Sequence, residues 1–324
     1  MASKPSIGGQ AVIEGVMMRG PASWAVAVRT PDGAITAETH MLPGHAQRYP
    51  FLRWPFVRGV YVLVESLSIG IRALRISTAH ALGEEERPSD KQLGWTMALA
   101  VLFFTGLFVA LPALAVKFGG RLLEQESQLV QNLAEGALRI GLFVGYILLI
   151  SLLPDIRRVF QYHGAEHKTI YAYENDDPLE PEVIDRYSTL HVRCGTNFLF
   201  IVLFLTLAAH LVLDLLLPPS IPLRVAARVL AIPFLAGLAY EVIKAASRQE
   251  NSLPFRILSL PGLALQKITT RPPSRDQIEV AVKAMESVIG REQLASSREP
   301  AQQVGAPIPP LAAPGAGTAP TGPA

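Results

Sequence analysis

Four long apolar stretches constrain the fold of this chain more than any other feature. The clearest runs from Leu93 to about Phe118 and carries a single charge, Lys117. A helix needs about 20 consecutive apolar residues to cross a hydrocarbon core of about 30 Å. We therefore expect transmembrane helices here and at three further places, about 137–153, 197–217 and 223–246.

Two residues complicate the first two stretches. Pro112 is expected to kink the first, because proline has no N–H to donate within a helix. Arg139 lies near the start of the second, which is also the shortest. This second stretch either crosses with the Arg139 side chain extended toward the interface, or enters and leaves the membrane on one side.

The composition agrees with a membrane protein. The 324 residues are 50% hydrophobic and only 17% charged, and the mean hydropathy is +0.30. The hydrophobic share and the mean hydropathy are high for a soluble domain, and the charged share is low. A net charge of +2 is too small to suggest nucleic-acid binding. The first residues contain no apolar core of a cleavable signal peptide. The lipid bilayer is therefore the first partner that we expect.

Positive charges predict the orientation, since Lys and Arg concentrate on the cytoplasmic side of a membrane. They precede the first stretch and follow the second and the fourth: Arg72, Arg75, Arg87 and Lys91; Arg157, Arg158 and Lys168; Lys244, Arg248, Arg256 and Lys267. Arg224 and Arg228, beside the second outer turn, argue the other way. We expect a multi-pass protein of the inner (plasma) membrane, with both termini and the loop 154–196 in the cytoplasm.

The flanking regions are expected to hold smaller elements. Residues 1–92 form a cytosolic or interfacial region, in which Pro31-Asp32-Gly33 between two alternating runs predicts a β-hairpin. Apolar residues at helical spacing, interrupted by charges, predict an amphipathic helix over about 56–79. The fold class expected is thus mainly α: a polytopic membrane protein with about four transmembrane helices, an amphipathic helix and a small β-hairpin.

The membrane domain is assigned to residues 93–250, and the chain returns to soluble character after it. Residues 251–295 are expected to form a cytosolic segment with one helix, for which Ser274 is a suitable N-cap. Before that helix, the sequence from Leu260 to Leu263 (Leu-Pro-Gly-Leu) predicts a turn. From 296 to 324 Ala, Pro and Gly dominate, which predicts a disordered tail.

The most chemically suggestive motif follows the second stretch. It reads His163-Gly-Ala-Glu166-His167, with two histidines four residues apart and a glutamate between them. On a helix, residues i and i+4 share one face, so both imidazoles can reach one divalent cation. In sites with this order the histidines hold the metal and the glutamate acts as general base. The plainer interpretation is a polar, solvated helix end.

A second polar group precedes the third stretch. His191 and Cys194 lie three residues apart, and Cys194 is the only cysteine in the chain. It could be a packed hydrophobe, a metal ligand or a nucleophile, but it cannot form an internal disulfide. Glu241 lies near the inner end of the fourth stretch. The expected topology brings His163, His167, His191, Cys194 and Glu241 together at the cytosolic membrane surface.

Histidine, thiolate and carboxylate suit a transition metal, with zinc first among the candidates. A catalytic site would use three protein ligands and keep one position open, whereas a structural site would use four. The spacing alone does not choose between them.

Several blocks together resemble a known family. They are GGQAVIEGVMMR from Gly8, HGAEHKTI from His163, RCGT from Arg193, and an ordered set of positions from Pro261 to Ala281. The chain is similar over about residues 7–290 to the domain of unknown function 1385 family, the YqhQ-like bacterial membrane proteins. That family carries the label "predicted metal-dependent enzyme". The polar group around His191 and Cys194 departs from the usual family pattern at Val192 and Asn197, and keeps His191 and Cys194.

Two hypotheses follow. The first is a metal-dependent membrane hydrolase in which Glu166 is the general base, acting on a lipid, a membrane peptide or a soluble molecule. The second is a non-catalytic membrane scaffold or regulator, whose metal or polar cluster ties the loop 154–196 to the helix ends and whose partner is another protein. Transport is the weaker third interpretation, since no inverted repeat is visible, although a homo-oligomer could supply more helices.

Overall fold

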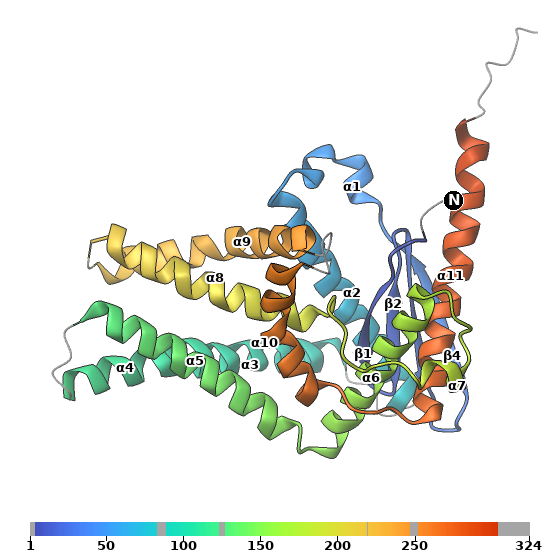
Figure 1. Ribbon diagram of the computed structural model, residues 1–324, viewed down its shortest axis with the longest axis horizontal. Helices are drawn as coiled ribbons and strands as arrows, with labels where there is room; N and C mark the ends of the chain where they lie inside the picture. Colours follow the sequence, from blue (N-terminus) through green and yellow to red (C-terminus); the bar gives the residue numbers. More distant parts are fainter. Residues whose placement is uncertain (1–3, 83–88, 123–126, 219, 247–251, 304–324) are drawn as a thin grey trace, which may run out of the picture.

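The computed structural model describes residues 4–82, 89–122, 127–218, 220–246 and 252–303. A bundle of long helices extends from one side of a part that contains a β-sheet (Figure 1). The elements are β1 (Gly8–Val12), β2 (Gly15–Arg19), β3 (Ser23–Arg29), β4 (Ile35–Met41), α1 (His45–Arg48), η1 (Pro50–Arg53), α2 (Val57–Leu82), α3 (Asp90–Thr105), the π-helical η2 (Gly106–Ala110), α4 (Leu111–Leu122), α5 (Gln128–Ile150), α6 (Pro154–Glu174), α7 (Pro181–Ile184), α8 (Gly195–Leu216), α9 (Ile221–Ala246), α10 (Leu253–Thr269) and α11 (Arg275–Gln303).

The four expected membrane helices are present. Within the described residues, Gly94–Gly120, Leu129–Ile150, Gly195–Leu213 and Ala226–Ala245 are long and apolar enough to cross a membrane. The second begins about two turns earlier than the apolar pattern predicted, because the polar residues before Ala137 belong to the same helix, α5. At 22 residues it is longer than the third and fourth spans, and its length does not require a re-entrant path.

Arg139 lies inside this helix and has partners within the bundle. Its guanidinium turns into the bundle: Nη2 contacts Glu135 Oε1 at 2.6 Å, and Nε donates to the Phe108 carbonyl at 2.8 Å. Pro112 has no N–H for the carbonyl four residues before it, which is that of Phe108. A π-helical turn, η2, lies just before this proline, as is common at interruptions of a helix. Arg139 thus donates to the carbonyl to which Pro112 of the neighbouring span cannot donate, and its side chain does not extend to the interface.

The N-terminal β element is larger than the predicted hairpin. Strands β3 and β4 form that hairpin around the Pro31-Asp32-Gly33 turn, and β1 and β2 add a second one. The result is an antiparallel sheet in the order β1-β2-β3-β4. The glycine-rich block at residues 8–15 hid the first hairpin from pattern reasoning, since glycine is depleted in strands.

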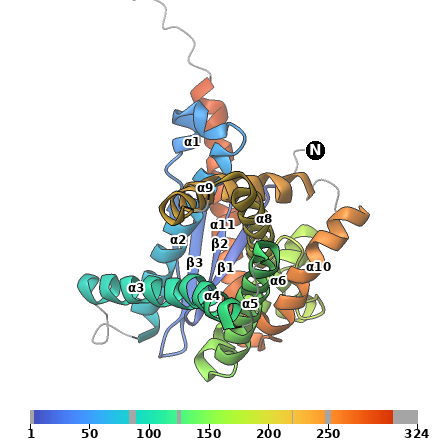
Figure 2. The ribbon, with the colours of Figure 1, turned by 90° about the vertical axis from the view of Figure 1, so that its left-hand side faces the viewer.

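Both faces of the sheet are covered by helices. Val16, Met18, Ala25 and Ala27 face α6 and α11, while the alternate residues, with Trp24 and Val26 among them, face α2. Side chains alternate across a strand, so two buried faces require apolar residues at nearly every position of β2 and β3. Figure 2, seen along the bundle, shows the sheet behind the membrane helices.

Helix α2 is the expected amphipathic helix, and it joins the sheet to the bundle. Ile69 and Ala73 pack on the sheet. At its other end Gly59 meets α9 so closely that a Cβ there would lie 2.9 Å from the Gly237 Cα. The two glycines allow the two backbones to approach each other, which fixes the sheet against the fourth span.

The C-terminal segment differs from expectation in two places. Leu260–Leu263 lies inside α10 and is not a turn, because α10 packs against α8: a Cβ on Gly262 would lie 1.6 Å from Asn197 Oδ1. Helix α11 starts at Arg275 as expected, and the Ser274 N–H donates to Gln277 Oε1 at 2.9 Å. It continues to Gln303, past the expected start of the tail at 296, and residues 304–324 lie outside the described residues.

Candidate metal centre

The His163–His167 motif lies on α6 at the junction of the bundle and the sheet. Pro154 occupies the first turn of this helix, where its missing N–H costs nothing, and Asp155 complements the helix dipole there. The motif is buried: the exposed fraction is 4% for Glu166 and 1% for His167. The plainer interpretation, a solvated helix end, is therefore wrong.

Backbone carbonyls fix both imidazole rings. His163 Nδ1 lies 2.8 Å from the Thr269 carbonyl oxygen, and His167 Nδ1 lies 2.5 Å from that of Thr189. A carbonyl oxygen can only accept, so each Nδ1 carries the hydrogen. The other nitrogen of each ring, Nε2, then carries the lone pair that can bind a metal or accept a hydrogen bond. This carbonyl-to-histidine arrangement is the usual outer shell of a histidine that binds a metal.

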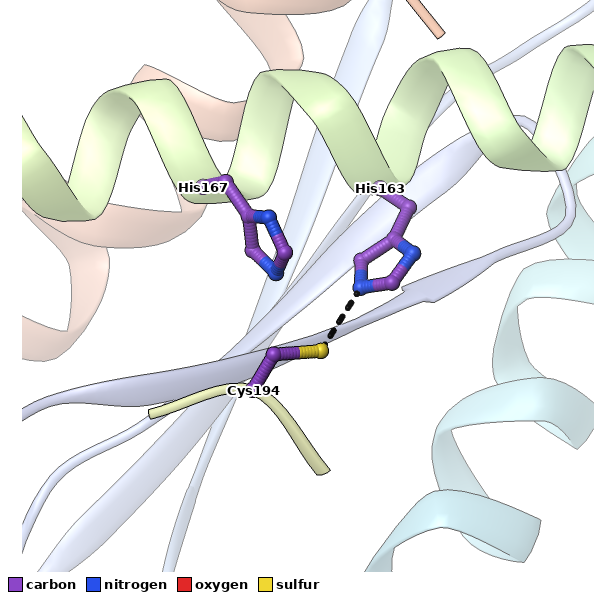
Figure 3. A group of neighbouring side chains, drawn as sticks. All are labelled: His163, His167 and Cys194. Atoms are coloured by element: carbon purple, nitrogen blue, oxygen red, sulfur yellow. Dashed lines mark hydrogen bonds between the residues drawn. The ribbon is translucent and has the colours of Figure 1, made fainter. Parts of the chain in front are cut away.

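Cys194 completes the group. It is the N-cap of α8, and its Sγ lies 3.3 Å from His163 Nε2 (Figure 3). The three ligand atoms of His163, His167 and Cys194 all lie within 4.8 Å of one another. Ligands that are 2.0–2.3 Å from a tetrahedral zinc ion stand about 3.5 Å apart. The spacing is thus close to what one ion requires.

One buried atom lacks a partner at this point. His167 Nε2 is buried and makes no hydrogen bond within the described residues. Burial lowers the pKa of His167, so the imidazole is kept in the neutral form that binds metals. An unsatisfied buried nitrogen beside a second Nε2 and a thiol fits a cation in the space between them.

Glu166 stands beside this group. Its Oε2 lies 3.8 Å from His163 Nε2 and 4.0 Å from His167 Nε2. Burial raises the pKa of Glu166, while the neighbouring histidines and a hydrogen bond from the Gly9 N–H oppose the rise. A carboxylate with a raised pKa is a better proton acceptor near neutral pH than an exposed one. Its position suits the expected role of general base.

His191 is near but is otherwise engaged. Its Nδ1 accepts the Arg193 N–H at 3.2 Å, and its Nε2 lies 3.4 Å from Glu174 Oε2. A neutral ring whose Nδ1 accepts must carry its hydrogen on Nε2, which leaves no lone pair for a metal. The structure brings His191 to the edge of the site and does not place it among the candidate ligands.

Glu241 is not brought to the group. Both of its carboxylate oxygens contact the Arg58 guanidinium, and the Nε–Oε1 distance is 2.6 Å. A bidentate ion pair of this kind uses the lone pairs that a metal would need. The expectation that the inner end of the fourth span would deliver a ligand overlooked Arg58, which reaches it from α2.

Two residues that sequence reasoning missed hold the site in shape. Buried Gln266 on α10 bonds the His191 backbone, and its Nε2 also donates to Thr196 Oγ1 at 3.1 Å. Gly9 of β1 lies against Glu166, where an added Cβ would be 2.7 Å from its Cγ. Both residues lie in the blocks that carry the family resemblance, and Gln266 is also an uncharged amide in an apolar helix; these were the signals that could have found them.

A cavity of about 1000 Å³ opens onto the group. The polar residues that line it include His163, Glu166, His167 and Cys194, and the apolar ones include Phe160 and Leu199. Residues from β1, α6, α8 and α9 line it, so the cavity lies where the sheet meets the ends of the third and fourth spans. Three candidate ligands, a buried carboxylate and an open cavity form an arrangement that can hold and activate a small reactant.

Comparison with known proteins gives the family. The family model described as "Protein of unknown function (DUF1385)" matches residues 54–291. The chain is 32% identical over 314 residues to a protein of Bacillus subtilis (strain 168) named "Uncharacterized protein YqhQ", and the alignment covers 91% of this chain and 96% of that protein. No solved structure matches. All three candidate ligands and Glu166 lie within the matched residues, and the chain belongs to the DUF1385 family.

Proposed function

We propose that this protein is a zinc-dependent hydrolase of the plasma membrane, with its site at the cytosolic membrane surface. The observation that carries the proposal is the convergence of two Nε2 atoms and one Sγ beside a buried carboxylate, at the wall of an open cavity. Three protein ligands with space for a reactant are the pattern of catalytic zinc sites.

Each residue has a distinct task in this proposal. His163, His167 and Cys194 hold the ion, and the Thr189 and Thr269 carbonyls keep both rings in the required tautomer. When bound, zinc supplies Lewis acidity toward a carbonyl or phosphoryl oxygen. Glu166 accepts a proton from the attacking water, and the Gly9 N–H orients its carboxylate.

The location rests on charge and topology. An even number of crossings would leave the N-terminal sheet and the C-terminal α11 on the same side, and these two elements pack together. Lys and Arg gather at that end of the spans, which favours the cytoplasm. The cavity lies among the same span ends.

Metal analysis tests the proposal directly. The full chain, purified in detergent, is measured by elemental mass spectrometry beside His163→Ala/His167→Ala and the control His45→Ala, which changes an exposed histidine of α1. We expect near-stoichiometric zinc in the wild type and the control and its loss in the double variant. If neither wild-type nor reconstituted protein retains metal, the proposal fails.

The scaffold function remains the second candidate, and one observation favours it. Metal held by His163, His167 and Cys194 would also tie α6 to the start of α8, across the loop that joins them. Glu166→Gln separates the two functions. In a hydrolase it keeps zinc and abolishes turnover; in a scaffold it keeps zinc and leaves partner binding unchanged.

A further inference from the structure

Strand β1 forms an open edge of the sheet beside the candidate metal centre. Its one strand neighbour within the described residues is β2. Gly8, Gly9 and Gln10 are exposed, and with Ala11 they line the cavity that contains His163 and Cys194. A sheet edge is therefore one wall of the site.

The register shows which backbone groups face outward. Strands β1 and β2 pair Val12 with Gly15 around a two-residue loop, and a pair that closes such a loop is hydrogen-bonded. Pairs alternate along an antiparallel ladder, so the N–H and C=O groups of Gly9 and Ala11 point away from β2. The Gly9 N–H hydrogen-bonds the Glu166 carboxylate, so a ligand at this edge would use the Gly9 C=O and the N–H and C=O of Ala11.

This edge lacks the usual protection against pairing. Natural edge strands carry charges, prolines or bulges that prevent another strand from adding. The sequence of β1 is Gly-Gly-Gln-Ala-Val, without a charge or a proline, and its register with β2 is regular. The opposite edge strand, β4, carries Glu38 and His40. An unprotected edge beside a reactive group suits an extended ligand that adds as a strand.

We propose that the outer edge of β1, from Gly8 to Ala11, binds an extended peptide segment and carries one of its peptide bonds to the metal centre. The inference deepens the proposed hydrolase function and rests on it for the chemistry. Outward backbone groups supply hydrogen bonds to a peptide, which is how β-augmentation gives affinity. The acyl chain of a lipid has no groups that would use them.

The size and surface of the cavity agree with such a ligand. A volume of about 1000 Å³ is at the upper end for ligand pockets. It accommodates a short extended segment and excludes a folded domain. Nothing lies within 4 Å of a Cβ built on Gly8, so another backbone can approach closely there, whereas the corresponding space at Gly9 holds the Glu166 side chain.

The reaction balances without a further reactant. The oxygen of water bonds to the peptide carbonyl carbon, and the C–N bond breaks. Glu166 takes one proton from the water and delivers it to the leaving nitrogen. The other proton leaves the new carboxyl group when it ionises and is taken up by the amine, so the products are a carboxylate and an ammonium group. Water and the peptide are the two reactants.

Binding is tested separately from turnover. Fluorescein-labelled β-casein, an unstructured protein, is titrated into the detergent-purified full chain before and after chelation of metal. Ala11→Pro removes the outward N–H, and proline is tolerated at an edge when its nitrogen faces away from the ladder. The matched control Ala11→Ser keeps that N–H. We expect the dissociation constant to rise about tenfold in Ala11→Pro alone, with or without metal.

Hydrogen exchange of the backbone amides provides a second test of binding that needs no variant. Bound β-casein should slow exchange of the Ala11 amide in the wild type. Absence of binding, equal affinity in both variants, or unprotected β1 amides would overturn the inference. So would binding of labelled phosphatidylglycerol in place of casein. If binding and protection hold but the zinc-loaded protein cleaves no casein, hydrolysis fails as the function and the peptide edge stands.

Discussion

Gln266 and His191 form a reciprocal pair of hydrogen bonds between a side-chain amide and a backbone. The His191 N–H donates to Oε1 at 2.8 Å, and Nε2 donates to the His191 carbonyl at 2.9 Å. Gln266 is fully buried on α10, three residues before Thr269, whose carbonyl orients His163. One residue therefore couples the turn that carries Cys194 to the helix that holds a histidine ring.

This coupling predicts that Gln266 controls metal affinity although it is not a ligand. Gln266→Leu should weaken zinc binding about 10–100-fold, as loss of an outer-shell partner does. It should also lower the free energy of unfolding by about 1–3 kcal/mol, because buried backbone groups lose their partners. Chelator competition and thermal unfolding measure the two effects.

Lys267→Gln is the control for this experiment, because it changes an exposed residue of the same helix. Gln266→Glu should give an intermediate zinc affinity, since a carboxylate still accepts the His191 N–H but donates nothing to its carbonyl. Unchanged zinc affinity in Gln266→Leu would show that the Cys194 turn holds its position without this side chain.

Adjacent glycines provide a matched pair for testing Glu166. Gly9→Ala would place a methyl group 2.7 Å from Glu166 Cγ, whereas Gly8→Ala meets nothing within 4 Å. We expect Gly9→Ala to displace the carboxylate and cost about 1–3 kcal/mol of stability. Gly8→Ala should be neutral. Thermal unfolding checks this difference, and equal melting temperatures in the two variants would contradict the close packing of β1 on Glu166.

The predictions that succeeded from sequence rest on local periodicity. Apolar length predicted four spans, helical spacing predicted α2, and the Pro31-Asp32-Gly33 turn predicted the β3–β4 hairpin. The i, i+4 rule likewise placed His163 and His167 on one face of α6. In each case the residues that decide the structure are close in the sequence.

The predictions that failed depend on a distant partner. Glu241 was expected beside the candidate metal ligands, but it forms an ion pair with Arg58 of α2. Leu260–Leu263 was expected to be a turn, but packing of Gly262 on Asn197 keeps it helical. No spacing rule within one segment identifies these partners, because tertiary contacts override local preference.

Arg139 and Glu135 should act as a unit within the bundle. Their side chains are 13% and 15% exposed, and Arg139 also serves the Phe108 carbonyl. Breaking this partly buried pair leaves one charge uncompensated, so Arg139→Leu should cost about 1–3 kcal/mol. The double variant Glu135→Leu/Arg139→Leu should cost less than the sum of the single changes. Unfolding in detergent measures this coupling, and strict additivity would contradict the pair.

His191 and Cys194 are expected to respond oppositely to substitution, although both were candidate ligands by sequence. The His191 ring accepts from Arg193 and faces Glu174, so His191→Ala should retain zinc. Cys194→Ala removes a ligand and should lower zinc affinity by far more than any change in the outer shell, that is, by more than about 100-fold. Elemental analysis after dialysis against a weak chelator measures both variants.

The backbone hydrogen bonds between His191 and Gln266 do not depend on the His191 side chain, so the Cys194 turn stays in place in His191→Ala. Loss of zinc from that variant would mean that the imidazole turns from Glu174 to the ion when metal binds.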